Sequence, residues 1–187
     1  DGGDSWSPVH NSLLRARVDS LFMDPNDPQV IYAGVRNGGV YRTTDGGQHW
    51  KALIQGITDL DSDNPAVVDG SRSDGGEVYF SHGFSFYRLA HQTWFNRGVS
   101  FTTTQFAVHP DDGSRLFVIA AQYQDWRGQD PPQLYRSEDR GKSMDLLGSP
   151  PAFSSGAPAL SWEDRLFYGV DAGGQEQLYV LNKGHFI

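Results

Sequence analysis

The chain has 187 residues, with 22 glycines, 10 prolines, no cysteine and an aromatic content of 13%. This length allows one domain with a sizeable core, and the composition suits many short strands joined by turns. The formal net charge of −8 argues against a nucleic-acid partner, because phosphate binding needs clustered lysine and arginine. The lack of cysteine excludes disulfides, and no apolar run is long enough to predict a transmembrane segment.

The first part of the chain predicts four consecutive strands. Alternating or continuous apolar residues favour strands, and clusters of Asp, Asn, Gly and Pro between them favour turns. The expected strands are 15–23, 29–35, 40–43 and 50–54. Four antiparallel strands in about 45 residues are typical of one blade of a β-propeller.

A polar corner separates the last two of these strands, with the pattern Thr43-x-Asp45-x-Gly47-x-x-Trp50. Glycine adopts positive φ without steric cost, and Asp45 can accept hydrogen bonds from the turn itself. This stretch resembles an Asp-box, also called a BNR repeat, and the match covers the full motif. We expect a structural role at the outer rim for these residues, rather than a catalytic one.

The corner recurs along the chain. Trp6, Trp50 and Trp94 are spaced 44 residues apart. A second polar corner, Ser137-x-Asp139-x-Gly141, keeps the turn residues but carries Met144 in the tryptophan position. The expected strands of the second repeat are 66–68, 77–80, 84–88 and the segment after Trp94. In the third repeat, residues 106–112 mirror 22–27, residues 116–117 correspond to 31–32, and residues 135–136 repeat the Tyr-Arg pair of 41–42. In the last repeat, 165–169 are expected as the second strand and 177–181 as the third.

The repeats predict an all-β fold, a single β-propeller domain of about four blades spanning residues 1–187. The expected blades are 11–55, 56–98, 99–149 and 150–187, with residues 1–10 lending a strand to the last one. Four blades could close on themselves in this way. The alternatives are a piece of a larger propeller in a longer chain, or two chains that assemble into a larger ring.

An insertion in the third repeat is the strongest candidate for ligand binding. Its central residues are Tyr123, Asp125, Trp126 and Arg127. Flat aromatic faces beside directional polar groups suit the recognition of sugar rings, and long loops are often functional. The alternative is a hairpin tip that folds Trp126 back onto its own blade.

Three alternating carboxylates, Asp59, Asp61 and Asp63, resemble the opening of a calcium loop. The remaining features of such a loop are absent, because Asn64 stands where glycine is required and Gly70 where glutamate is required. Calcium is therefore one hypothesis, and a solvated acidic loop is the other. We predict no further cofactor, since the six histidines show no metal-ligand spacing.

The repeats are similar to those of the Asp-box β-propeller superfamily, which includes sialidases, xyloglucan-active glycoside hydrolases, sortilin-type receptors and photosystem II assembly factors. Such a resemblance implies a fold but not a single function. Our hypothesis is a non-catalytic binding or assembly module for a carbohydrate or a protein partner. The alternative is a sialidase-like or xyloglucanase-like glycoside hydrolase, or a fragment of one. The resemblance also favours a secreted or periplasmic location.

Overall fold

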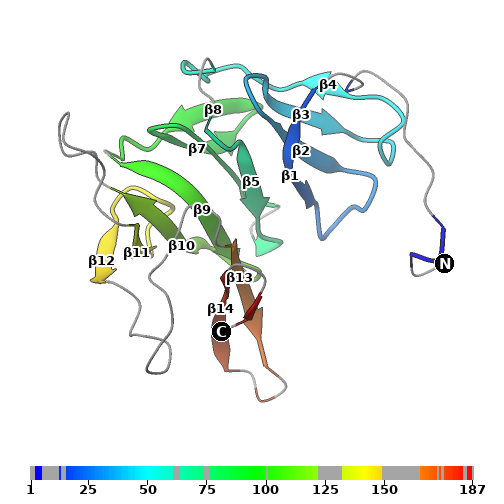
Figure 1. Cartoon of the computed structure of the whole chain (residues 1–187). Coiled ribbons are helices and arrows are strands. Elements are labelled where there is room, and N and C mark those ends of the chain that lie inside the picture. Colours follow the sequence, from blue (N-terminus) through cyan, green and yellow to red (C-terminus); the bar gives the residue numbers. More distant parts are fainter. Residues whose placement is uncertain are drawn as a thin grey trace.

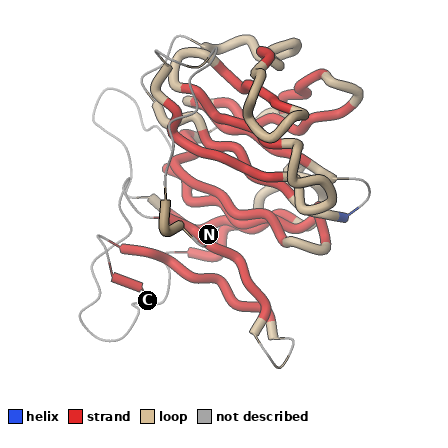
Figure 2. Tube along the Cα trace, turned by 90° about the vertical axis from the view of Figure 1, so that its right-hand side faces the viewer, coloured by secondary structure: helices blue, strands red, loops and turns tan. Residues whose placement is uncertain are grey.

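The computed structural model describes residues 3–5, 13, 16–60, 64–73, 76–99, 101–121, 132–148, 165–171, 173, 175–182 and 185–186. The described residues contain no α-helix, and their strands form four separate antiparallel sheets (Figure 1). Figure 2 shows these sheets stacked as successive layers, with the strands of the last sheet at one end of the stack.

Within each sheet, strands that follow one another in the chain lie side by side. The first sheet contains β1 (Val18–Met23), β2 (Ile31–Val35), β3 (Gly39–Thr43) and β4 (Lys51–Ala52). The second contains β5 (Val67–Gly70), β6 (Val78–His82), β7 (Ser85–Ala90) and β8 (Thr93–Asn96). The third contains β9 (Thr102–His109), β10 (Asp112–Ala121), β11 (Gln133–Ser137) and β12 (Asp145–Gly148), and the fourth contains β13 (Arg165–Val170), β14 (Glu176–Asn182) and β15 (His185–Phe186).

Local turn chemistry sets the register of these hairpins. β2 and β3 pair from Ile31 opposite Thr43 to Val35 opposite Gly39. The turn between them places Asn37 at φ 56° and Gly39 at φ 75°, a region that asparagine and glycine tolerate best. Because side chains alternate along a strand, this register decides which side chains of the first sheet face the second.

Three apolar clusters form the core, one between each pair of consecutive sheets. The cluster between the first and second sheets includes Tyr32, Val40, Val68, Phe80 and Trp94; the next includes Tyr79, Phe86, Phe106, Val108, Leu116 and Val118; the last includes Ala107, Ile119, Leu134 and Leu166. Glycine permits close approach at these layers, since a Cβ atom on Gly34 would lie 2.3 Å from the carbonyl oxygen of Ala66. Layered four-stranded sheets packed in this way confirm the predicted β-propeller fold class.

The first strand of each sheet packs against the first strand of the next: β1 against β5, β5 against β9, and β9 against β13. This arrangement corrects one prediction. Residues 165–169 were expected to form a second strand, but as β13 they occupy the first position of the described sheet, and 177–181 lie in the second strand, β14. Both positions carry the same short apolar pattern, so packing against β9, rather than the pattern itself, distinguishes them.

The four sheets form a fan, with β1 at one end and β13 at the other (Figure 1). The described sheets do not close into a ring, because the first and the last sheet each have a neighbouring sheet on one side only. The four first strands therefore line the inner, concave side of an open propeller.

Candidate functional site: the axial groove

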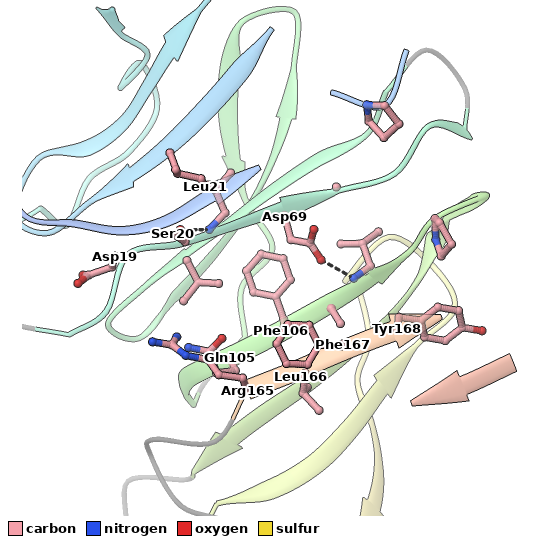
Figure 3. A pocket seen from close by; sticks show the side chains of 17 residues that line it. Asp19, Ser20, Leu21, Asp69, Gln105, Phe106, Arg165, Leu166, Phe167 and Tyr168 are labelled. Carbon is pink, nitrogen blue, oxygen red and sulfur yellow. Dashed lines mark hydrogen bonds between the residues drawn. The ribbon is translucent and has the colours of Figure 1, made fainter. Parts of the chain in front are cut away.

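The concave side of the fan holds an open groove with a cavity volume of about 580 Å³. All four first strands, β1, β5, β9 and β13, contribute to its walls (Figure 3). Its polar side chains include Asp19, Asp69, Gln105 and Arg165, and each comes from a different strand. Concave sites lined by apolar side chains and a few polar groups are the usual places for ligand binding, so this groove is the candidate functional site.

Asp19 and its neighbour Ser20, in β1, fasten the first sheet to the second. The Asp19 carboxylate accepts hydrogen bonds from the backbone N–H of Ala66 (3.1 Å) and from Arg36 (2.8 and 3.1 Å). Burial opposes the ionisation of Asp19, but the bonds from Arg36 and Ala66 outweigh it and lower the pKa of this carboxyl group. Ser20 Oγ accepts from the N–H of Val68 at 2.8 Å and donates to the carbonyl oxygen of Ala66 at 2.7 Å.

Asp69, in β5, makes the corresponding connection between the second and third sheets. Its Oδ2 accepts the backbone N–H of Val108 in β9 at 2.9 Å, as Figure 3 shows. Burial raises the pKa of Asp69 to about 6, although the hydrogen bonds from Val108 and Gly70 act in the opposite direction. Among the described residues, no cation forms an ion pair with Asp69. The groove therefore contains two aspartates in similar structural positions whose pKa values shift in opposite directions.

The bonds of Asp19 and Asp69 to the neighbouring sheets limit their use as catalytic groups in the groove. Hydrolysis of a glycosidic bond generally requires two carboxyl groups facing the substrate, one as an acid and one as a base or nucleophile. The carboxyl groups that line the groove among the described residues are Asp19 and Asp69. Both hold the backbone of the next sheet, so neither is a free partner for such a reaction.

Apolar side chains are also exposed in the groove. Leu21 of β1 is 65% exposed and Phe167 of β13 is 47% exposed. Both line the groove, as do the polar side chains of Gln105 and Arg165. Exposed apolar side chains next to a few polar groups are typical of a binding surface.

The first polar corner lies outside the groove, between β3 and β4. Thr43 Oγ1 donates to Asp45 (2.7 Å) and accepts the backbone N–H groups of Asp45 (3.2 Å) and Gly47 (3.0 Å). The Asp45 carboxylate accepts the N–H of His49 at 2.9 Å, and this bond is the main reason for its lowered pKa. Trp50 Nε1 donates to the carbonyl oxygen of Gly47 at 3.0 Å, which holds the indole ring over the turn.

The second polar corner, between β11 and β12, repeats this network. Ser137 Oγ donates to Asp139 (2.9 Å) and accepts the N–H groups of Asp139 (3.3 Å) and Gly141 (2.9 Å). Asp139 accepts the N–H of Ser143 at 2.9 Å and its hydroxyl at 2.7 Å. Burial opposes ionisation of Asp139, but these bonds outweigh it and lower its pKa to about 2. None of the residues of either corner lines the groove.

A buried ion network that the sequence did not indicate joins the second and third sheets. Glu77 is 5% exposed and accepts two hydrogen bonds from Arg88 (both 2.8 Å) and one from Arg140 (2.7 Å). The hydroxyl of Tyr79 lies 2.7 Å from the Glu77 carboxylate and 2.6 Å from the carbonyl oxygen of Gly113. Burial opposes ionisation of Glu77, but the bonds from Arg88, Arg140 and Tyr79 lower its pKa to about 2.

This network has the residue types of a sialidase site but not its accessibility. A sialidase needs arginines that converge on a substrate carboxylate, and a tyrosine with a glutamate partner. Here the arginines converge on Glu77 itself, and Tyr79 is fully buried. The network therefore fits a structural role between sheets.

The remaining predicted site residues fall mostly in segments that the structure does not describe. Tyr123, Asp125, Trp126 and Arg127 lie outside the described residues, so the sugar-binding hypothesis for this insertion stays a prediction. Asp61 and Asp63 also lie outside them. The carbonyl oxygen of Asp59 is 3.1 Å from Nδ1 of His82. Among the described residues, no group of three or more His, Asp or Glu side chains could hold a metal ion.

Known structures provide the comparison for this fold. No protein-family model matches the chain, and no curated protein matches it in sequence. The structure is similar to an ancestral GH74 enzyme (TM-score 0.64, 15% identity, covering 97% of this chain and 23% of that one). It is also similar to the GH74 xyloglucanase from Xanthomonas campestris (TM-score 0.55, 14% identity, covering 89% of this chain and 29% of that one).

These similarities support the propeller fold, and the chain spans only about a quarter of the length of the two GH74 enzymes. A weaker similarity is to YCF48 bound to a D1 peptide (TM-score 0.41, 20% identity, covering 79% of this chain and 59% of that one). At such identities the likeness bears on fold and not on activity. No helix among the described residues is long and apolar enough to cross a membrane.

Proposed function

We propose that the chain is a non-catalytic propeller module of the Asp-box type, and that its axial groove binds a segment of a partner protein. The matching hydrogen-bond networks of the two polar corners support the assignment to the Asp-box type. In both, a buried hydroxyl and an aspartate hold the turn between the third and fourth strands. Both corners lie away from the groove, which leaves the groove as the surface for binding.

One observation carries the non-catalytic proposal: both groove carboxylates are bonded to backbone N–H groups of the adjacent sheet. An acid or nucleophile must change its protonation or bonding during a reaction. For Asp19, protonation would weaken the bonds that join the first sheet to the second; for Asp69, a bond to a substrate would compete with the bond from the N–H of Val108. We therefore assign them to the scaffold and not to turnover.

The groove chemistry favours a polypeptide as its ligand. Each strand that lines the groove is an edge strand of its sheet, and edge strands can pair with an extended segment. Leu21 and Phe167 offer apolar contacts, and Gln105 and Arg165 offer directional polar ones. Sugar recognition remains tied to Trp126 and its neighbours, which the structure does not describe.

A phage-displayed library of random peptides tests this proposal directly. We expect selected peptides to bind the chain, and Arg165→Ala to weaken their binding by about tenfold, the value of one good polar contact. Arg72→Ala is the matched control, since Arg72 is an exposed arginine outside the groove. Failure to select any peptide, or equal effects of the two variants, would contradict groove binding.

The second candidate, a glycoside hydrolase or a piece of one, is favoured by the fold shared with the two GH74 enzymes. Incubation with a panel of plant polysaccharides and sialosides distinguishes it. Release of soluble sugar would overturn the non-catalytic proposal. Retention on a polymer without release would instead identify carbohydrate as the ligand.

A further inference from the structure

The repeated Tyr-Arg pair gives the chain three arginines at one equivalent position. Arg42, Arg88 and Arg136 lie on the third strands of their sheets, β3, β7 and β11. Each stands directly opposite an aromatic residue of the second strand, in the order Tyr32, Tyr79 and Phe117. Residues directly opposite each other share one face of a sheet. The first three sheets therefore present one arginine position in three different surroundings.

In the second and third sheets this arginine lies beside a carboxylate. Arg88 donates two hydrogen bonds to Glu77, both of 2.8 Å. Nε of Arg136 lies 3.5 Å from the carboxylate of Glu138. The positive charge of the arginine is thus compensated locally at both positions.

The first sheet departs from this pattern. Among the described residues, Arg42 forms no ion pair with a carboxylate. Its guanidinium carbon lies 5.7 Å from the centroid of the Tyr32 ring, and its Nε is buried without a hydrogen-bond partner in the described part of the chain. The residue directly opposite Arg42 in β4 is a second cation, Lys51. Like charges in directly opposite positions destabilise a sheet, so this position carries two cations that the sheet itself does not balance.

Arg42 lines two adjoining hollows between the first and second sheets, with volumes of about 450 and 280 Å³. Leu53 and Gln92 line both hollows, and Lys51 lines the smaller one. We call the two hollows together the rim cleft; none of these four residues lines the axial groove. Nε1 of Trp94 in β8 donates to the carbonyl oxygen of Leu53 at 2.7 Å, which fastens the two sheets beside the cleft.

The carboxylates that line the rim cleft already have partners. Glu77 belongs to the buried ion network, and Asp45 accepts hydrogen bonds from Thr43 and His49. An anion that enters the cleft therefore meets two uncompensated cations, while the carboxylates beside them are occupied.

A turn with an unusual backbone conformation borders the cleft. His91 and Gln92 connect β7 to β8, with φ values of 49° and 62°. Two consecutive residues other than glycine are uncommon in this region, and backbone strain of this kind clusters at ligand sites. Both side chains are exposed and line the cleft, so the Gln92 amide can donate hydrogen bonds to a bound group.

We propose that the rim cleft binds a phosphate group, with Arg42 and Lys51 as its cationic contacts. The planar fork of an arginine suits two hydrogen bonds to an oxyanion. A phosphate monoester carries a charge of about −1.5 to −2 at pH 7, which balances two cations better than the single charge of a carboxylate. Leu53 and the ring of Tyr32 offer apolar contacts to the substituent of such an ester. The site is separate from the axial groove, so it stands or falls independently of peptide binding there.

Isothermal titration calorimetry at pH 7 and constant ionic strength tests this site with sodium phosphate, phenyl phosphate and sodium acetate. We expect saturable binding of phosphate, and binding of acetate at least about tenfold weaker, because acetate carries a single charge. Arg42→Gln should weaken phosphate binding by about tenfold or more, since it removes charge-assisted hydrogen bonds. Arg136→Gln is the matched control: it changes the equivalent arginine of the third sheet, outside the cleft, and should leave the affinity unchanged.

The phenyl phosphate titration identifies the source of the phosphate group. Tighter binding of phenyl phosphate than of inorganic phosphate would assign the site to a monoester whose substituent contacts Leu53 and Tyr32. Equal affinities would assign it to free phosphate.

Lys51→Glu separates the charge of the site from the stability of the fold. It gives Arg42 a carboxylate neighbour, just as Asp145 stands opposite Arg136 in β12. This variant should lose phosphate binding while its Tm stays at or above that of the wild type. Phosphate should raise the Tm of the wild type but not of this variant, because only a bound ligand stabilises the folded state. Lys142→Gln, at an exposed lysine outside the cleft, should behave like the wild type.

Three results would overturn the proposal. The first is a wild-type chain that shows no saturable binding of either phosphate compound. The second is an affinity for acetate equal to that for phosphate. The third is an equal loss of phosphate binding in Arg42→Gln and Arg136→Gln.

Discussion

Replacement of Glu77 by glutamine tests whether the buried ion network holds the second and third sheets together. The substitution keeps the size of the side chain but removes the charge that Arg88 and Arg140 share. Two guanidinium groups then remain close together without their counter-ion. Breaking a buried pair by removing one partner typically costs about 3 kcal/mol or more.

The lowered pKa of Glu77 gives a second value for the stability that Glu77→Gln should lose. A folded pKa of about 2, against 4.5 for an unperturbed glutamate, corresponds to roughly 3 kcal/mol of stabilisation. We reduce this to about 2 kcal/mol, because the side chains of Arg88 and Arg140 are 29% and 39% exposed and water screens them. A loss of about 2–3 kcal/mol should lower the Tm by roughly 4–12 °C in a domain of this size.

The pH dependence separates this electrostatic account from a packing effect. Since the folded pKa is depressed, the stabilisation by Glu77 is present above pH 4.5 and is lost as the pH falls toward 2. Glu77→Gln should therefore melt well below the wild type at pH 7 and approach it in acid. Glu138→Gln, which alters an exposed ion pair with Arg136, is the matched control and should change the Tm by less than about 2 °C. If Glu77→Gln behaves like this control, or if its deficit is the same at every pH, the reasoning is wrong.

Two further predictions concern the polar corners and the groove aspartates. Thr43→Ala and Ser137→Ala should each lower the free energy of unfolding, measured in urea, by about 1–2 kcal/mol, because each buried hydroxyl accepts two backbone N–H groups. Thr44→Ala, at an exposed neighbour, should change it by less than about 0.5 kcal/mol. An equal loss in Thr44→Ala would show that the corner hydroxyls do not stabilise the fold through these bonds. Asp69→Asn should raise the Tm at pH 7 but not at pH 4, since a pKa raised to about 6 means that stability is lost as the pH rises through 6. Asp19→Asn should lower the Tm at pH 7, because the pKa of Asp19 is lowered and its charged form therefore stabilises the fold. A shift of the Tm in the same direction for both variants at pH 7 would contradict the opposite roles given to the two charges.

Sequence reasoning identified the features whose chemistry is local. The corner of Thr43, Asp45 and Gly47 was predictable because the bonds made by the Thr43 hydroxyl and the Asp45 carboxylate join residues at most four positions apart. The hairpins and the layered β-propeller fold followed from turn residues and repeats in the same way.

Features that depend on distant residues were not predictable. Glu77 and Arg140 are 63 positions apart, and no spacing links them. Asp69 gave no signal either, since its role depends on a backbone N–H group of Val108 in another sheet. The segment 165–169 was assigned to the wrong strand position, because the first and second strands carry similar apolar patterns and only the packing against β9 separates them.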